Sequence, residues 1–222
     1  MPNSLPALSL LEARVLGTLI EKERTVPDTY PLSLNALVSG CTQKSSRNPV
    51  MSASPAEVQA AIDSLKRYNL VLETNGGRVA RYAHNAERVL QQPSEAMALL
   101  AVLMLRGPQT AGELRVNCER LQTFADIAVA EALLLELATR PGGPLAVELP
   151  RLPGARENRW AETLSVAAIA AHEAPAAPVV EASLGEVASL KANVARLEAR
   201  LNHLQSLVGK LYAEIGMPVG AD

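Results

Sequence analysis

The stretch SPAEVQAAIDSLKRYNLVLETNGGRVARYAH, residues 54–84, begins with a helical pattern and ends with a β pattern. Ser54, Pro55 and Glu57 supply an N-cap, a first-turn proline and a capping-box acid, so we expect a helix to begin here. Its predicted buried face consists of Val58, Ala61, Ile62 and Leu65. After Asn69 the apolar period falls to two, and Asn75-Gly76-Gly77 provides a turn between two short strands. The stretch therefore predicts a helix followed by a β-hairpin.

Two more helices are expected upstream of this stretch. Apolar residues at helical spacing predict a first helix from Leu10, behind the N-cap Ser9. Prolines then interrupt the pattern around a short extended stretch, Val26–Tyr30, and a second amphipathic helix covers Leu34–Cys41. The order helix, short strand, helix, helix, hairpin is that of the winged helix-turn-helix.

The same order recurs in the next part of the chain. Helices are expected over Ser94–Leu105, Thr110–Leu121 and Ala125–Thr139, and strands over Leu145–Leu149 and Asn158–Thr163. The predicted fold is therefore mainly α with small β-hairpins (α+β), with two tandem winged helix-turn-helix domains: residues 1–90, the first copy, and residues 91–164, the second copy.

Several core positions match between the two copies. Cys41 of the first copy corresponds to Cys118 of the second. The buried faces of the third helices also correspond, with Val58, Ile62 and Leu65 matching Ala130, Leu134 and Leu137. Because the two cysteines occupy equivalent inward positions and form no C-x-x-C pair, we expect them to pack in the core and to form neither a disulfide nor a zinc site.

The carboxy-terminal part differs in composition. Residues 165–183 form an Ala/Pro-rich linker, residues 184–216 a heptad pattern and residues 217–222 a tail. The a and d positions are Val187, Leu190, Val194, Leu197, Leu201, Leu204, Val208, Leu211 and Ile215. β-Branched residues at a and leucine at d favour a parallel two-stranded coiled coil, and hence a homodimer. The alternative is an amphipathic helix that folds back onto the chain's own domains.

Several short motifs are similar to those of a known family. They are TYPLSLNAL at 29–37, QKSSR at 43–47, RVARYAH at 78–84, GELR at 112–115 and LPR at 149–151. Over roughly residues 8 to 163 the chain resembles the YceH-like family of bacterial proteins. The resemblance implies a tandem winged-helix fold, and it supplies no molecular activity.

Composition and charge exclude several classes of function. The chain has 222 residues, a formal charge of −2 and only 3% aromatic residues, which argues against a protein that stacks single-stranded bases. We found no signal peptide or membrane span, so a cytoplasmic protein is expected. The histidines are scattered, and the sequence contains no nucleophile elbow, phosphate loop or zinc-ligand spacing, so we expect a protein without catalytic activity, metal or cofactor.

Duplex DNA is the first candidate partner. Residues 44–88 contain seven basic and four acidic side chains, and the predicted wing, residues 75–85, contains no acidic residue. The candidate DNA-contacting residues are Gln43, Lys44, Ser45, Arg47, Gln59, Arg78, Arg81 and His84. The same charges could instead form an ordinary solvated surface.

A protein partner is the alternative. The third helix of the second copy should expose Glu131 and Glu136 beside Ala128, Ala132 and Leu135, a surface better suited to a protein than to DNA. We expect the lone tryptophan, Trp160, to pack in the core. Two hypotheses follow: a dimeric protein that contacts the DNA backbone through the first copy, and a scaffold that binds a protein without touching DNA.

Overall fold

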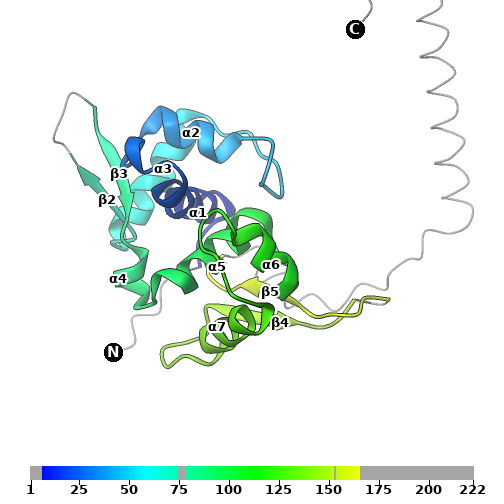
Figure 1. Cartoon of the computed structure of the whole chain (residues 1–222). Coiled ribbons are helices and arrows are strands. Elements are labelled where there is room, and N and C mark those ends of the chain that lie inside the picture. Colours follow the sequence, from blue (N-terminus) through cyan, green and yellow to red (C-terminus); the bar gives the residue numbers. More distant parts are fainter. Residues whose placement is uncertain (1–6, 75–78, 153, 166–222) are drawn as a thin grey trace, which may run out of the picture. The chain divides into compact units, whose positions relative to one another are not determined.

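The computed structural model describes residues 7–74, 79–152 and 154–165, which belong to one compact unit (Figure 1). It is a mixed α and β structure, as the sequence predicts. Arg78, the linker from residue 166 onward, the heptads and the tail lie outside the described residues, so the structure does not test these predictions. In the first copy the elements are α1 (Leu10–Thr25), the 3-10 helix η1 (Pro27–Thr29), β1 (Leu32–Ser33), α2 (Leu34–Thr42), α3 (Pro55–Arg67), β2 (Val71–Thr74), β3 (Arg81–His84) and α4 (Ala86–Leu90). In the second copy they are α5 (Ser94–Arg106), α6 (Ala111–Cys118), α7 (Ile127–Thr139), β4 (Ala146–Leu149) and β5 (Arg159–Glu162).

The predicted starts of α1 and α3 are confirmed. Ser9 caps α1 and Ser54 caps α3, and each forms a capping box with the glutamate three residues later. On α3 the buried residues are Val58, Ala61, Ile62 and Leu65, the four that its helical period predicts. Local sequence therefore fixes both where α3 begins and which face it buries.

Between α1 and α2 the structure differs from the prediction. The chain was expected to be extended over Val26–Tyr30, but Pro27–Thr29 forms a 3-10 turn, in which the Tyr30 amide donates to the Pro27 carbonyl. Proline is well suited to a first helical turn, because its φ is fixed near the helical value and it lacks the amide that would be unpaired there. The extended strand begins two residues later, at Leu32, where β1 pairs with Tyr82 and makes β3 the centre of a three-stranded antiparallel sheet, β1-β3-β2.

The second copy follows the predicted order with two differences: α6 ends at Cys118 and not at Leu121, and α7 begins at Ile127 and not at Ala125. A short helix that the sequence does not predict, α4, ends the first copy and leads into the second. Strands β4 and β5 form an antiparallel pair, to which Gln109 adds an isolated bridge opposite Trp160. Trp160 is buried, as expected for a packing residue.

Both copies contribute to a single hydrophobic core. The helix α1 packs against α5, and at the contact a Cβ added to Gly17 would lie 3.1 Å from the Leu105 side chain. Nine consecutive residues of α1, from Ala13 to Glu21, are buried. A helix buried on all sides is typical of the centre of a protein. We conclude that α1 and α5 form the shared centre of the described unit.

The two matched cysteines are buried in this core, as their equivalent positions predict. Neither Cys41 nor Cys118 forms a disulfide. Burial raises the pKa of both thiols, that of Cys118 to about 12. Each therefore packs as a neutral, apolar side chain.

Candidate functional site

The loop between α2 and α3 contains Arg47, which was expected to contact phosphate. The structure corrects this expectation, because the Arg47 side chain is fully buried and forms a bidentate ion pair with Glu21 of α1. Its Nη2 lies 2.6 Å from Glu21 Oε2 and its Nη1 lies 3.1 Å from Glu21 Oε1, while Nε donates to the Gly40 carbonyl. Arg47 is therefore a structural residue that holds the loop against α1 and α2.

Glu21 belongs to a buried polar stripe that the sequence analysis did not identify. Arg14, Thr18 and Glu21 occupy positions i, i+4 and i+7 of α1, and all three are buried against α2 and the loop. The Arg14 guanidinium donates to the carbonyls of Cys41 and Pro49. Polar residues at helical spacing within an otherwise apolar helix are the signal that could have identified the stripe.

Gln43, Lys44 and Ser45 lie in the same loop, and Lys44 and Ser45 are exposed. Gln43 is half-buried, and its side-chain amide donates to the Ser45 carbonyl. The loop is also bound to the second copy, because the Asn48 amide donates to the Leu105 carbonyl. Figure 1 shows this loop beside α5, at the opposite end of the first copy from the β2–β3 hairpin. Loop and hairpin thus do not form one continuous basic face.

In the hairpin, His84 is also in a structural position, and this corrects its expected role in DNA contact. Only 4% of its side chain is exposed, and its Nε2 lies 2.7 Å from Glu23 Oε2 on α1. Its backbone amide donates to the Tyr30 hydroxyl. Arg81 is exposed, and its Nη1 donates to the carbonyls of Thr29 and Pro31. Of His84 and Arg81, only Arg81 remains accessible to a polyanion.

The accessible face of α3 offers little for reading bases. Gln59 donates to Asp63 and accepts a hydrogen bond from the Tyr82 hydroxyl, so its amide group is already engaged. Ala60 and Asp63 are exposed beside it, and a carboxylate there repels phosphate. The first copy therefore retains Lys44, Ser45 and Arg81 as its accessible candidate contacts, with Gln43 partly accessible.

The third helix of the second copy, α7, presents a different surface. It buries Ala130, Leu134 and Leu137 and exposes most of its remaining residues. The exposed residues include Ala128, Glu131, Ala132, Leu135 and Glu136, as the sequence predicts. Leu135 is 52% exposed and Ile127 45% exposed. This surface is apolar with acidic edges.

A search for other chemistry gives two findings about the described part of the chain. No group of three or more His, Cys, Asp or Glu side chains within it could hold a metal ion. No helix within it is long and apolar enough to cross a membrane.

Comparison with known proteins places the chain in a family. A family model described as "Protein of unknown function, DUF480" matches residues 8–155. A UPF0502 protein of Dechloromonas aromatica (strain RCB) is 56% identical over 212 residues, covering 94% of this chain and 97% of the relative. Another UPF0502 protein, from Burkholderia pseudomallei (strain K96243), is 54% identical over 219 residues, covering 98% and 93%. The chain thus belongs to the DUF480 family of UPF0502 proteins, in agreement with its YceH-like motifs.

Proposed function

We propose that this protein is a non-enzymatic interaction module in which two winged-helix copies form a fixed pair and α7 of the second copy binds a protein partner. The observation that carries the proposal is the exposed apolar face of α7. In a winged helix that binds DNA, the third helix is the one that enters the major groove, so its exposed face is a natural place for contact with another molecule. In the first copy the corresponding helix, α3, is polar on its exposed side, so the two copies are suited to different surfaces.

The α7 surface has the geometry of a helix-docking site. Ala128, Ala132, Leu135 and Thr139 recur at spacings of four, three and four residues, so they form one stripe along the helix, opposite the buried residues. Two alanines in this stripe allow the backbone of a partner to approach closely. Because the stripe is apolar, its burial against a partner is favourable, at about 25 cal/mol per Å².

The charges beside the stripe indicate the chemistry of the partner. Glu131 and Glu136 lie on its two sides, and both are exposed. A partner helix with an apolar face between lysine or arginine residues would complement these carboxylates, which favour a correctly oriented encounter and oppose acidic partners. The proposed partner is therefore a protein with a basic amphipathic helix.

A matched pair of variants tests this proposal. Ala132 of α7 and Ala60 of α3 occupy equivalent positions, and both are exposed. We expect Ala132→Glu to abolish capture of a protein from nuclease-treated bacterial lysate, and Ala60→Glu to leave capture unchanged. The captured protein should present a basic amphipathic helix that, as a synthetic peptide, competes for binding. The proposal is wrong if Ala132→Glu leaves capture unchanged, or if the captured material disappears on nuclease treatment.

DNA contact by the first copy is a second candidate function, which the exposure of Lys44 and Arg81 favours. These side chains would contact the phosphate backbone, together with Gln43, Ser45 and Arg78, the last of which lies outside the described residues. Each lost phosphate contact reduces the slope of log K against log salt by about 0.9. We expect the double variant Lys44→Ala/Arg81→Ala to reduce the slope by about two, and Arg120→Ala in the second copy to leave it unchanged. Absence of duplex binding even at low salt would exclude this function.

Dimerisation through the heptads is compatible with both candidate functions, because a dimer would present two copies of the protein-binding or the DNA-binding surface and increase avidity. Truncation before Glu186 should convert the protein to a monomer with an unchanged helical core. Light scattering measures the mass, and a truncated protein that remains dimeric would exclude the coiled coil.

A further inference from the structure

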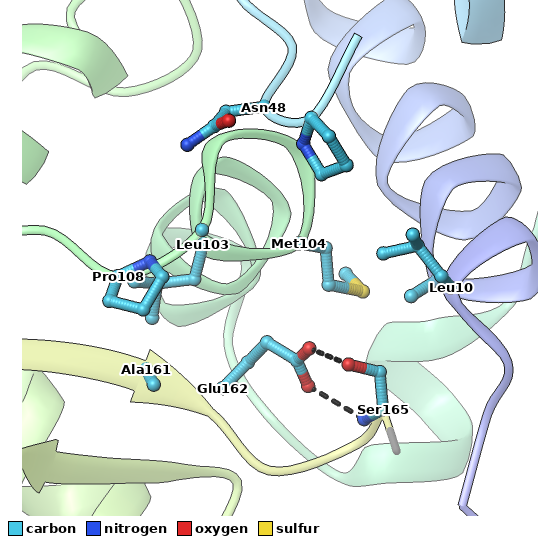
Figure 2. Close-up of a pocket in the computed structure, with 11 residues that line it drawn as sticks. Leu10, Asn48, Leu103, Met104, Pro108, Ala161, Glu162 and Ser165 are labelled. Carbon is cyan, nitrogen blue, oxygen red and sulfur yellow. Dashed lines mark hydrogen bonds between the residues drawn. The ribbon is translucent and has the colours of Figure 1, made fainter. Parts of the chain in front are cut away.

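A pocket of about 170 Å³ lies where the two copies meet (Figure 2). Its walls come from the start of α1, the loop before α3, the end of α5 and the end of β5. Most of the lining is apolar and includes Leu10, Pro49, Leu103, Met104 and Ala161. A cavity of this size accommodates a compact ligand, since an apolar cavity of about 150 Å³ can hold benzene.

One of the polar residues that line the pocket is Glu162, the last residue of β5. Its exposed fraction is 5%, and Figure 2 shows its carboxylate beside Met104 and Ser165. Glu162 Oε2 accepts hydrogen bonds from the backbone amides of Leu164 and Ser165, and Oε1 accepts one from the Ser165 hydroxyl. A carboxylate oxygen can accept two hydrogen bonds, so Oε1 retains one acceptor position among the described residues.

No cation balances this carboxylate within the described part of the chain, where the salt bridges involve other acids. Burial raises the pKa of the Glu162 carboxyl, and the hydrogen bonds from Ser165 and Leu164 offset that effect only in part. A buried carboxylate normally has a cationic partner, because burial of an unpaired charge is costly. The ionised form of the Glu162 carboxyl is thus complementary to a cation.

Asn48 is a second polar residue at the same pocket. Asn48 lines it and is exposed, while its backbone amide is bound to the Leu105 carbonyl. This bond fixes the main chain at Asn48, and its side chain adds a hydrogen-bonding group among the residues that line the pocket. The pocket therefore combines an apolar wall, a carboxylate and an amide, the combination typical of small-molecule sites.

We propose that this pocket binds a small organic cation, in which a primary ammonium or amidinium group meets Glu162 and a compact apolar body packs against Leu103, Met104 and Ala161. The hydrogen bonds from Ser165 and Leu164 hold the carboxylate in place before the ligand arrives. This site does not depend on the proposed partner surface, because no residue of α7 lines the pocket.

The test compares two probes of equal size on the full-length protein. Benzylamine carries an ammonium group at neutral pH, whereas benzyl alcohol has the same shape without charge. The readout is the methyl resonance of Met104 in protein labelled at the methionine methyl groups, assigned with the conservative variant Met104→Leu. We expect both probes to shift this resonance, with benzylamine binding at least tenfold more tightly, because a charged hydrogen bond is stronger than a neutral one.

Two variants identify the group responsible. Glu162→Gln keeps the shape of the side chain and removes its charge, so the tenfold preference for benzylamine should disappear. Glu148→Gln changes an exposed carboxylate on the neighbouring strand β4, and the preference should remain. Equal affinities of the two probes for the unchanged protein, no shift of Met104 with either probe, or an unchanged preference in Glu162→Gln would overturn the proposal. The comparison of probes on the unchanged protein does not depend on whether a variant folds.

Discussion

Replacement of Arg47 by methionine tests whether the loop before α3 depends on a buried ion pair. The change preserves much of the apolar stem and leaves the Glu21 carboxylate without its bidentate partner, while Gly40 loses a donor to its carbonyl. Removing one member of a buried pair typically costs about 3–5 kcal/mol, because the remaining charge is uncompensated. For a chain of this size, that corresponds to a fall in Tm of roughly 6–20 °C.

The pH dependence of this loss follows from the pKa of Glu21. Burial acts to raise it, but the hydrogen bonds and charge of Arg47, together with Lys22, outweigh burial, and the net pKa is lowered. A carboxyl whose pKa is lowered on folding stabilises the protein above its unfolded pKa, about 4.3 for glutamate, and loses that contribution as pH falls through the folded value. In Arg47→Met the effect of burial on Glu21 is no longer offset by Arg47, so the folded pKa of Glu21 rises, and the difference between the original protein and the variant should shrink steadily as the pH falls from neutral through the folded pKa values of Glu21 in the two proteins.

Urea unfolding followed by circular dichroism measures this difference at each pH. The matched control is Lys44→Met, an exposed cation in the same loop, which should change the free energy of unfolding by less than about 0.5 kcal/mol. The double variant Arg47→Met/Glu21→Leu should recover part of the loss, because it leaves no unpaired charge. A loss below about 1 kcal/mol in Arg47→Met, or a loss that is the same at pH 7 and pH 3, would refute this reasoning.

Other predictions concern packing and capping. Gly40→Ala should destabilise the protein by about 1–3 kcal/mol, because the added Cβ would lie 2.6 Å from Thr18 Cγ2. Gly112→Ala should not destabilise it, because the added Cβ would lie 3.7 Å from its nearest neighbour, Ile127 Cδ1. Arg24→Ala removes hydrogen bonds to the Leu121 and Ser94 carbonyls and should cost about 1–3 kcal/mol in urea unfolding. Ser54→Ala should cost about 1 kcal/mol through loss of the α3 cap. Both cysteines should resist Ellman's reagent at pH 8 until the protein unfolds, since both thiols are buried and their pKa values are raised.

Local signals account for the parts of the fold that the sequence predicts well. The helix α3 begins at a capping box and buries four residues at helical spacing, and both features depend on neighbouring residues only. The short helix α4 is not predicted from the sequence, because it has only five residues and its N-cap residue makes no side-chain hydrogen bond. The sequence predicts an extended stretch at Pro27 and not the 3-10 turn, because the fixed φ of proline is compatible with both conformations.

The candidate site was harder to predict, because burial of a charged residue depends on partners that are distant in sequence. Arg47 is of a residue type that commonly contacts DNA phosphate, but its ion-pair partner, Glu21, lies 26 positions away in the sequence. The partner of His84, Glu23, lies 61 positions away. The apolar face of α7 was predicted from periodicity alone, since exposure on a helix follows from the position of its buried stripe. The Glu162 pocket gave no sequence signal, because its walls come from four separate segments.

The packing of α1 against α5 also has a consequence for how the chain folds during synthesis. Sixty-eight residues, 26–93, separate the two helices, and at about 5–20 residues per second the ribosome needs several seconds to produce them. During that interval α1 can pack only against α2, α3 and β3, and the side of α1 around Gly17, which contacts Met104 and Leu105 of α5, is not yet covered. The nascent first copy therefore exposes the α5-facing side of α1 until α5 emerges.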